Sequence, residues 1–124
     1  MELRVARHSN NLDQLIRFYS DLLGLKLLGS FKDHDGYNGI FLGKEGLSWH
    51  LEFTSSSSPA KHDSDEDDLL VFYCQSEEEY ASINARFKKE GISTIKSKNP
   101  YWNNHGSYYL DPDGFGIIIA KKRP

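Results

Sequence analysis

The stretch Gly106-Ser-Tyr-Tyr-Leu-Asp-Pro-Asp-Gly-Phe-Gly-Ile-Ile-Ile-Ala120 contains two β-rich runs on either side of Asp-Pro-Asp-Gly. Pro112 restricts φ at the second position of a turn, and Gly114 can take the positive φ that closes it. Aromatic and β-branched residues flank the turn on both sides, so the stretch predicts an antiparallel β-hairpin.

Two amphipathic helices are predicted upstream of this hairpin. Asn11 with Gln14 and Ser76 with Glu79 stand at the spacing of a capping box, which predicts a helix start at each place. Apolar residues then recur at helical spacing, and a glycine follows each stripe as its expected end. The stripes are Leu12, Leu15, Ile16, Tyr19, Leu22 and Leu23 in the first helix, and Tyr80, Ile83 and Phe87 in the second.

The remaining β-rich runs lie at residues 3–9, 25–31, 37–42, 47–54, 69–74 and 94–96, with an irregular segment predicted at 98–105. The elements therefore follow the order βαβββ twice, at an offset of about 65 residues, which indicates an internal repeat. We predict a single domain of two modules, residues 3–55 and 68–122. A Ser-rich, acidic linker over residues 56–67 joins them and is predicted to be solvated.

Composition narrows the possible functions. The 124 residues suit one small domain, and a net charge of −3 gives no basic footprint for nucleic acid. No apolar run is long enough to span a bilayer, and the first residues lack a signal-peptide pattern. Cys74 is the one cysteine, so it cannot form an internal disulfide, and we expect it to be a packing residue. These features predict a cytoplasmic protein without a nucleic-acid or membrane partner.

Two motifs lie in the repeated elements, Asn11-Leu12 with Ile16, Phe18-Tyr19 and Leu22–Leu25 in the first half, and Tyr109–Phe115 in the second. With these motifs the chain resembles the vicinal oxygen chelate superfamily, which includes glyoxalases, bleomycin-resistance proteins, fosfomycin-resistance transferases and extradiol dioxygenases. The resemblance implies an α+β fold in which two βαβββ modules form a half-open mixed β-sheet barrel around a cavity, with one helix covering each module. It also implies a homodimer.

Metal-dependent members of this superfamily place His or Glu ligands on the first and fourth strands of each module. Carried onto this chain, the positions are Arg4, Glu52, Leu69 and Ile118. A guanidinium has no lone pair to donate, and two of the other side chains are hydrocarbon. One carboxylate does not hold a divalent cation, so the resemblance predicts neither the usual metal site nor another cofactor.

Strand alternation predicts which side chains face the cavity. The expected cavity-facing residues are Arg4, Ala6, His8, His50, Glu52, Thr54, Leu69, Val71, Tyr73, Gly116, Ile118 and Ala120. The residues expected under the helices are Val5, Leu51, Phe53, Leu70, Phe72, Ile117 and Ile119. From the first set and the aromatic segment before the hairpin, the predicted ligand-binding residues are Arg4, His8, His50, Glu52, Tyr73, Trp102 and His105.

Arg4 and Glu52 occupy positions that ligate one metal in related proteins, so their heads are predicted to meet. Such a pair either lines the cavity as an ion pair, or Arg4 binds an anionic ligand while Glu52 accepts a hydrogen bond; the two interpretations are compatible.

The leading functional hypothesis is a metal-independent small-molecule binding protein of the glyoxalase/bleomycin-resistance type, with no catalytic residue assigned. One alternative is a metal-dependent lyase or isomerase of the glyoxalase type with displaced ligands at His8, His50 and Glu52; a dioxygenase would likewise need the missing ligands. The other alternative is a non-catalytic interaction module that uses an open sheet face.

Overall fold

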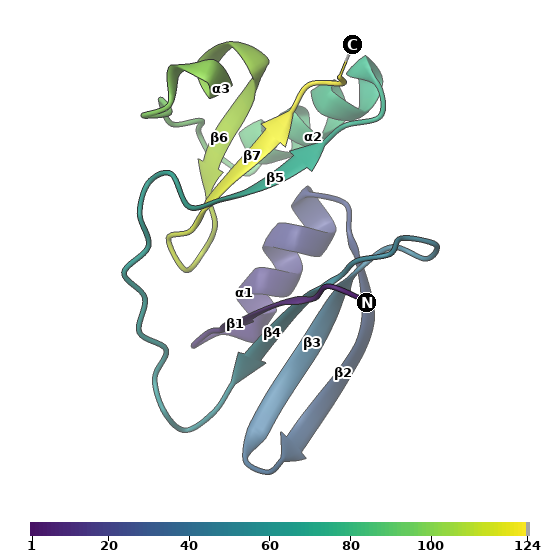
Figure 1. Cartoon of the computed structure of the whole chain (residues 1–124), viewed down its shortest axis with the longest axis vertical. Coiled ribbons are helices and arrows are strands. Elements are labelled where there is room, and N and C mark those ends of the chain that lie inside the picture. Colours follow the sequence, from purple (N-terminus) through teal and green to yellow (C-terminus); the bar gives the residue numbers. More distant parts are fainter. Residues whose placement is uncertain (124) are drawn as a thin grey trace. The chain divides into compact units, whose positions relative to one another are not determined.

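The computed structural model describes residues 1–123, which divide into two compact units, residues 1–62 and residues from 63 onward. We call them the first and second module (Figure 1). Each combines a mixed sheet with a helix that packs against it, so the predicted α+β class and the repeat of a two-module fold are confirmed. No helix within residues 1–123 has the length and apolar character needed to cross a membrane.

The first module contains β1 (Val5–His8), α1 (Leu12–Ile16), β2 (Lys26–His34), β3 (Tyr37–Gly43) and β4 (Leu51–Ser55). Its four strands lie in the order β1-β4-β3-β2. β1 runs parallel to β4, and the other two pairs are antiparallel. Parallel neighbours need a long crossover, and the chain between β1 and β4 provides it.

The helix of the first module begins and ends where the sequence predicts. The Asn11 side chain accepts a hydrogen bond from the backbone N–H of Gln14 at 3.1 Å. The α-helical turns continue as a π-helical segment, Arg17–Leu22, and Gly24 follows with a φ of 98°. The apolar stripe faces the sheet, where the Tyr19 ring stacks on that of Phe53 at 5.2 Å between centroids.

The second module contains β5 (Leu69–Tyr73), α2 (Glu77–Lys89), α3 (Pro100–His105), β6 (Gly106–Leu110) and β7 (Gly116–Ala120). Its three strands lie in the order β5-β7-β6, with β5 parallel to β7. β6 and β7 form the predicted antiparallel hairpin. The carboxylate of Asp111 closes its turn by accepting the backbone N–H groups of Asp113 and Phe115, and Gly114 takes a φ of 84°.

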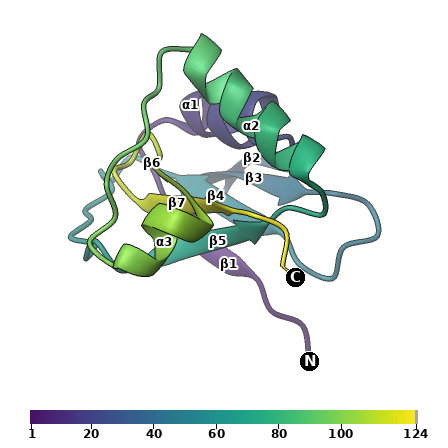
Figure 2. The same cartoon turned by 90° about the horizontal axis from the view of Figure 1, so that it is seen from above.

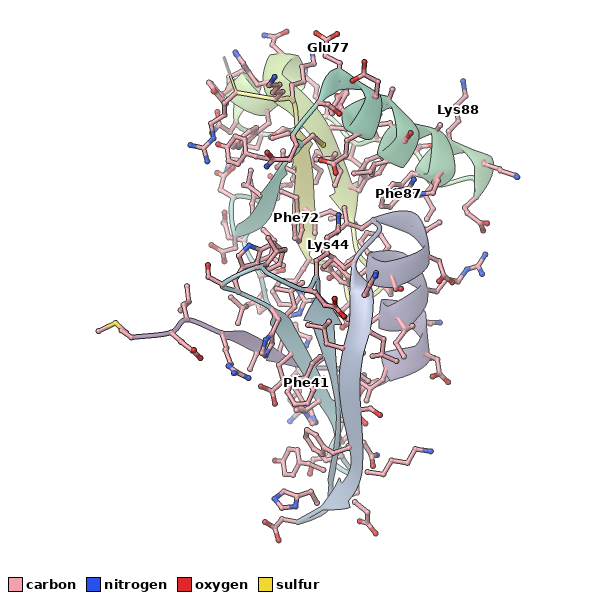
Figure 3. The ribbon with its side chains drawn as sticks, turned by 90° about the vertical axis from the view of Figure 1, so that its right-hand side faces the viewer. Phe41, Lys44, Phe72, Glu77, Phe87 and Lys88 are labelled. Carbon is pink, nitrogen blue, oxygen red and sulfur yellow. The ribbon has the colours of Figure 1, made fainter. Side chains whose placement is uncertain are left out.

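Helix α2 covers one face of the second sheet (Figure 2). Ser76 caps its start by accepting the N–H of Glu79 at 3.1 Å, as predicted. Glu77 lies at its first turn and Lys88 at its last, where both charges favour the helix dipole (Figure 3). The ring of Phe87 stacks on Tyr109 of β6 at 4.2 Å, which fixes the helix on the sheet. Cys74 is buried, in keeping with a packing residue.

The segment between α2 and the hairpin differs from the prediction. The predicted strand at 94–96 is wrong: only Ile95 pairs, by an isolated bridge to Tyr108. The predicted irregular segment at 98–105 is also wrong, because residues 100–105 form α3. The start signal was present in the sequence: the Asn99 side chain caps the helix, and Pro100 stands at its first turn, where a missing N–H costs nothing.

Candidate functional site on the open face of the first sheet

The first sheet has one face under α1 and one open face. Strand register confirms the predicted alternation, because Ala6 and Phe41 both lie beside Glu52, and His8 lies beside Thr54. The alternating residues Leu42, Leu51 and Phe53 are buried on the helix side. On the open face, by contrast, side chains remain exposed or half-exposed. Figure 3 shows Phe41 on the side of this sheet that faces away from α1.

Four side chains cross this open face from strand to strand, and we call them the cross-strand row: Phe31, Phe41, His50 and Arg4. The Phe31 and Phe41 rings lie 5.9 Å apart between centroids. The His50 ring stands edge-on to Phe41 at 5.5 Å. The Arg4 Nη1 atom donates to Nε2 of His50 at 2.9 Å, which links the ends of β1 and β4. The row therefore joins an aromatic half to a cationic end.

Glycines on β3 make room for the row. A Cβ at Gly39 would meet the Phe31 ring, and one at Gly43 would lie 3.0 Å from Cβ of His50. Both positions therefore need glycine, because only a residue without a side chain leaves room for Phe31 and His50 on this face. The aromatic half of the row is built into the strands rather than added from a loop.

The Arg4–His50 hydrogen bond fixes the His50 tautomer. A guanidinium carries only donors, so Nε2 of His50 must accept, and the ring proton of neutral His50 lies on Nδ1. Nδ1–H is then the donor that remains for a ligand. The Arg4 side chain keeps 52% of its surface exposed and lies 3.6 Å from Glu2, a surface pair of little energetic weight.

The structure pairs Arg4 differently from the prediction. Its partner is His50 rather than Glu52, because the parallel register puts Ala6, not Arg4, beside Glu52. Glu52 is half-buried on the open face, and among residues 1–123 it makes no ion pair. His50, just before β4, and Glu52 within it thus lie on one face in different settings: His50 is bonded to the guanidinium of Arg4, and Glu52 makes no ion pair among the described residues.

His8, the third predicted ligand residue of this face, is occupied by the protein itself. Its Nδ1 lies 2.8 Å from the Thr54 hydroxyl, and its Nε2 lies 3.1 Å from the Ser56 hydroxyl and 3.2 Å from the Ser58 carbonyl. A carbonyl only accepts, so Nε2 carries the proton and Nδ1 accepts from Thr54. His62 donates in turn to the His8 carbonyl at 2.7 Å. Residues 56–62, predicted to be solvated linker, are therefore hydrogen-bonded to the end of β1.

The predicted residues of the second module lie on a face that its own side chains fill. Ile118 and Ala120 form a buried cluster with Tyr108, and Leu69, Val71 and Trp102 pack against it. Trp102 belongs to α3, on the face away from α2, and its ring lies 6.4 Å from Tyr73. Asn103 holds α3 in place because its side-chain amide bonds both the N–H and the carbonyl of Ser97.

The other two predicted residues of this module lie at its edge. Tyr73 is exposed beneath the guanidinium of Arg123, whose Cζ is 3.9 Å from the ring centroid. His105 stacks on Tyr101 at 4.0 Å, and its Nδ1 donates to the Tyr101 carbonyl at 2.8 Å. Both are engaged by neighbours of their own module.

Two phenols of the second sheet have perturbed acidity. Burial raises the pKa of Tyr108 above its ordinary value, and the nearby carboxylates of Glu66, Asp67 and Asp65 raise it further. The Tyr108 hydroxyl donates to the Glu66 carbonyl at 3.2 Å. Burial also raises the pKa of Tyr109, with a smaller contribution from Tyr80. Both phenols stay protonated at neutral pH and act as hydrogen-bond donors.

The side chains at the positions implied by the resemblance do not fit a metal ion. In the second module both are hydrocarbon and lie in the apolar cluster. In the first module the guanidinium of Arg4 takes the Nε2 lone pair of His50 and adds a positive charge. Displaced ligation through His8 would have to break its bonds to Thr54 and Ser58. Within residues 1–123, no three His, Cys, Asp or Glu side chains gather as a metal site would require.

Sequence reasoning missed the aromatic half of the row. Phe31 and Phe41 lie on strands that were predicted, but the open face was assigned only from the first and last strand of each module. Counting back from the β2–β3 turn at Asp35-Gly36 does not find this half of the row, because that count puts Phe31 beside Ile40. A register shift between Phe31 and His34 is what brings Phe31 beside Gly39 and Phe41 beside Gly29. A large ring opposite a glycine, twice on one face, indicates rings lying along the sheet.

Comparison with known families gives matches over nearly the whole chain. The profile of the YycE-like N-terminal domain matches residues 3–54, and that of the YycE-like C-terminal domain matches residues 67–121. The chain is 40% identical to the protein YycE of Bacillus subtilis (strain 168) over 126 residues, which cover 98% of this chain and 88% of that protein. These matches extend through both modules.

Solved structures with the same fold include proteins of different activity. The crystal structure of Bacillus subtilis YycE aligns with a TM-score of 0.88 at 39% identity, covering 99% of this chain and 90% of that one. Leishmania major glyoxalase I, described as trypanothione-dependent, aligns at 0.76 with 20% identity over 98% and 86% of the two chains. TnmS3, an antibiotic binding protein from Streptomyces sp. CB03234, aligns at 0.69 with 16% identity over 99% and 96%. The last two likenesses establish the fold alone.

Proposed function

This chain belongs to the YycE-like family, with the glyoxalase/bleomycin-resistance type of fold of the vicinal oxygen chelate superfamily, and we propose that it is a metal-independent small-molecule binding protein. The observation that carries this proposal is the cross-strand row. It presents aromatic surface and a cation side by side on an open sheet face, in a position where related metal enzymes need ligands for an ion.

The chemistry of the row favours binding over metal-assisted catalysis. Small-molecule sites are lined by aromatic side chains with a few fixed polar groups, which is the composition found here. A metal-dependent glyoxalase needs several neutral or anionic ligands around one ion. Arg4 provides the opposite, a permanent positive charge that already occupies the nearest imidazole lone pair.

A protein of the same fold with a binding role supports the proposal. TnmS3 is an antibiotic binding protein, so this fold serves binding in at least one relative of similar length. For this chain we expect a ligand that touches Arg4, His50 and Glu52 on the open face of the first module. Homodimer formation and a cytoplasmic location are part of the same proposal, and light scattering of the purified chain tests the first.

The decisive experiment measures metal content and turnover on the purified full chain. We expect substoichiometric zinc, nickel, cobalt and manganese by mass spectrometry, no change of Tm with EDTA or added metal, and no turnover of a hemithioacetal. Stoichiometric metal together with turnover would establish the lyase interpretation and overturn the proposal.

A thermal-shift screen of small molecules tests directly whether the protein binds one. Compounds that raise Tm should lose their effect in Phe41→Ala, which removes the centre of the row. Leu27→Ala is the matched control, because it deletes an exposed apolar side chain from the same sheet without touching the row. Equal loss in both variants would mean that binding depends on the stability of the module and not on its open face.

A further inference from the structure

We propose that the open face of the first sheet selects a flat aromatic acid that carries a hydrogen-bond donor at its far end. This inference rests on the proposed function and specifies its ligand. The aromatic ring would lie against Phe41, the carboxylate would meet Arg4, and the distal donor would meet Glu52.

The carboxylate end follows from the donors that the protein leaves available. Arg4 has five N–H donors: Nη1 is directed at His50, and Nη2 lies 3.6 Å from the exposed Glu2 carboxylate, a contact that a ligand carboxylate would replace. The bond to His50 turns Nδ1–H of that ring away from the guanidinium, so the anion site at this end of the row consists of the other N–H groups of Arg4. The remaining guanidinium donors, with their fixed positive charge, suit a planar oxyanion, and carboxylate is the planar oxyanion that a guanidinium binds through two parallel bonds.

The flat ring follows from the rest of the row. Phe41 lies directly beside His50, at 5.5 Å, and Phe31 continues the apolar surface at 5.9 Å. Gly39 and Gly29 leave these rings without competing side chains on the same face. Aromatic rings prefer offset or edge contacts with other rings, so an aryl group gains more here than an aliphatic group of equal area.

The distal donor follows from Glu52. Its carboxylate lies on the same face as His50, which immediately precedes β4, and the two-residue spacing places the two side chains about 6.6 Å apart at their bases. That separation is close to the distance between the carboxylate and the hydroxyl of 4-hydroxybenzoate. A second anion at the Glu52 end would be repelled, so the ligand needs a donor there and not another acid.

The test uses 4-hydroxybenzoate as the probe, followed by NMR on the full chain. Two comparators isolate its ends: 4-hydroxybenzamide lacks the charge, and 4-methoxybenzoate lacks the donor. Cyclohexanecarboxylate keeps the charge without the aromatic ring. We expect shifts at the row with 4-hydroxybenzoate, and about ten- to hundredfold weaker binding for the amide, which loses the charge-assisted bonds. The methoxy and cyclohexyl compounds should bind several-fold more weakly.

Variants assign the effect to Arg4. Arg4→Leu should weaken 4-hydroxybenzoate about ten- to hundredfold while leaving the weak binding of the amide unchanged. Arg4→Lys, which keeps the charge but not the planar fork, should fall between. Lys44→Leu is the matched control: it removes one positive charge from an exposed turn of the same module and should not change the affinity. Circular dichroism checks that each variant is folded.

The outcomes separate this inference from the function on which it rests. If the neutral amide binds the row as tightly as the acid, or if Arg4→Leu leaves the affinity of the acid unchanged, the aromatic-acid inference is wrong and a binding function stands. If no probe shifts the resonances of the row, the inference is also wrong. Stoichiometric metal with hemithioacetal turnover would overturn the binding function itself.

Discussion

The two modules share a similar order of elements, but the sheet face away from the helix is exposed in the first module and packed in the second. In the first, the face away from the helix carries exposed and half-exposed polar and aromatic side chains across four strands. In the second, the corresponding face is packed by Tyr108 and Trp102 over Ile118. The second module is stabilised by the packing on this face, whereas the first module leaves the side chains of its face exposed or half-exposed.

The cause lies in one element of the repeat. The first module has a long second strand, β2, which supplies Phe31 and extends the sheet. At the equivalent place the second module has only the Ile95 bridge and then α3, which lays Trp102 on the sheet. Replacing a strand with a short helix therefore converts an open sheet face into a small apolar core.

The largest expected difference is in the free energy of unfolding lost when alanine replaces Ile118 or Glu52, which stand at equivalent positions of the two modules. Ile118 is fully buried, so Ile118→Ala should lower the free energy of unfolding by about 2–5 kcal/mol through lost burial and a cavity. Glu52→Ala should change it by less than about 0.5 kcal/mol, because its side chain is half-exposed and without an ion pair among the described residues. Urea unfolding of both variants measures the two values. Equal losses would mean that the open face of the first module is structural after all.

Local sequence rules predicted most of what the modules share. Capping spacing located both helix starts at Asn11 and Ser76, and turn chemistry located the hairpin at Pro112. These features depend on neighbours within a few residues. Strand alternation likewise assigned Ile118 and Glu52 to the faces on which they lie.

What the sequence did not predict depends on contacts between distant segments. The partner of Arg4 is set by the parallel register of β1 and β4, which brings His50 beside it, and no local pattern encodes that register. The ring of Trp102 covers the second sheet only because Asn103 anchors α3 to Ser97. Alternation states which face a residue shares, but not which neighbours it meets there.

The next effect tests whether the aromatic half of the row is built into the sheet. Gly39→Ala would put a methyl group into the Phe31 ring, so either the ring leaves the face or the strands shift, at a cost of about 1–3 kcal/mol. Gly29→Ala is the matched control, because its added Cβ would lie at an ordinary 3.5 Å from Phe41. Thermal unfolding and the NMR shifts of Phe31 check the pair. A Gly39→Ala variant as stable as Gly29→Ala, with an unmoved Phe31, would contradict the close packing described for this face.

A smaller effect on stability is expected at the helix N-caps, which the two modules have in common. Asn11 and Ser76 cap α1 and α2 with the same bond, at 3.1 Å in each case. Asn11→Ala and Ser76→Ala should therefore each lower the free energy of unfolding by about 1 kcal/mol. Ser57→Ala, in an exposed part of the connector, is a control with no helix to cap. Unequal losses at the two caps would show that the resemblance of the modules does not extend to the energetics of their helices.

The last effect is a loss of stability in alkali, and it concerns the packed face of the second module. The raised pKa of Tyr108 means that the native state holds this proton at a pH where the unfolded chain, with a tyrosine pKa of about 10, has released it. The resulting stability is fully present below pH about 10 and is lost as the pH rises through the native pKa. Absorbance of tyrosinate should show a late-titrating fraction that includes Tyr108 and Tyr109. Tyr108→Phe should remove one phenol from that late fraction. If the removed phenol comes instead from the earlier-titrating fraction, the second face is wetter than its packing indicates, and the contrast between the modules weakens.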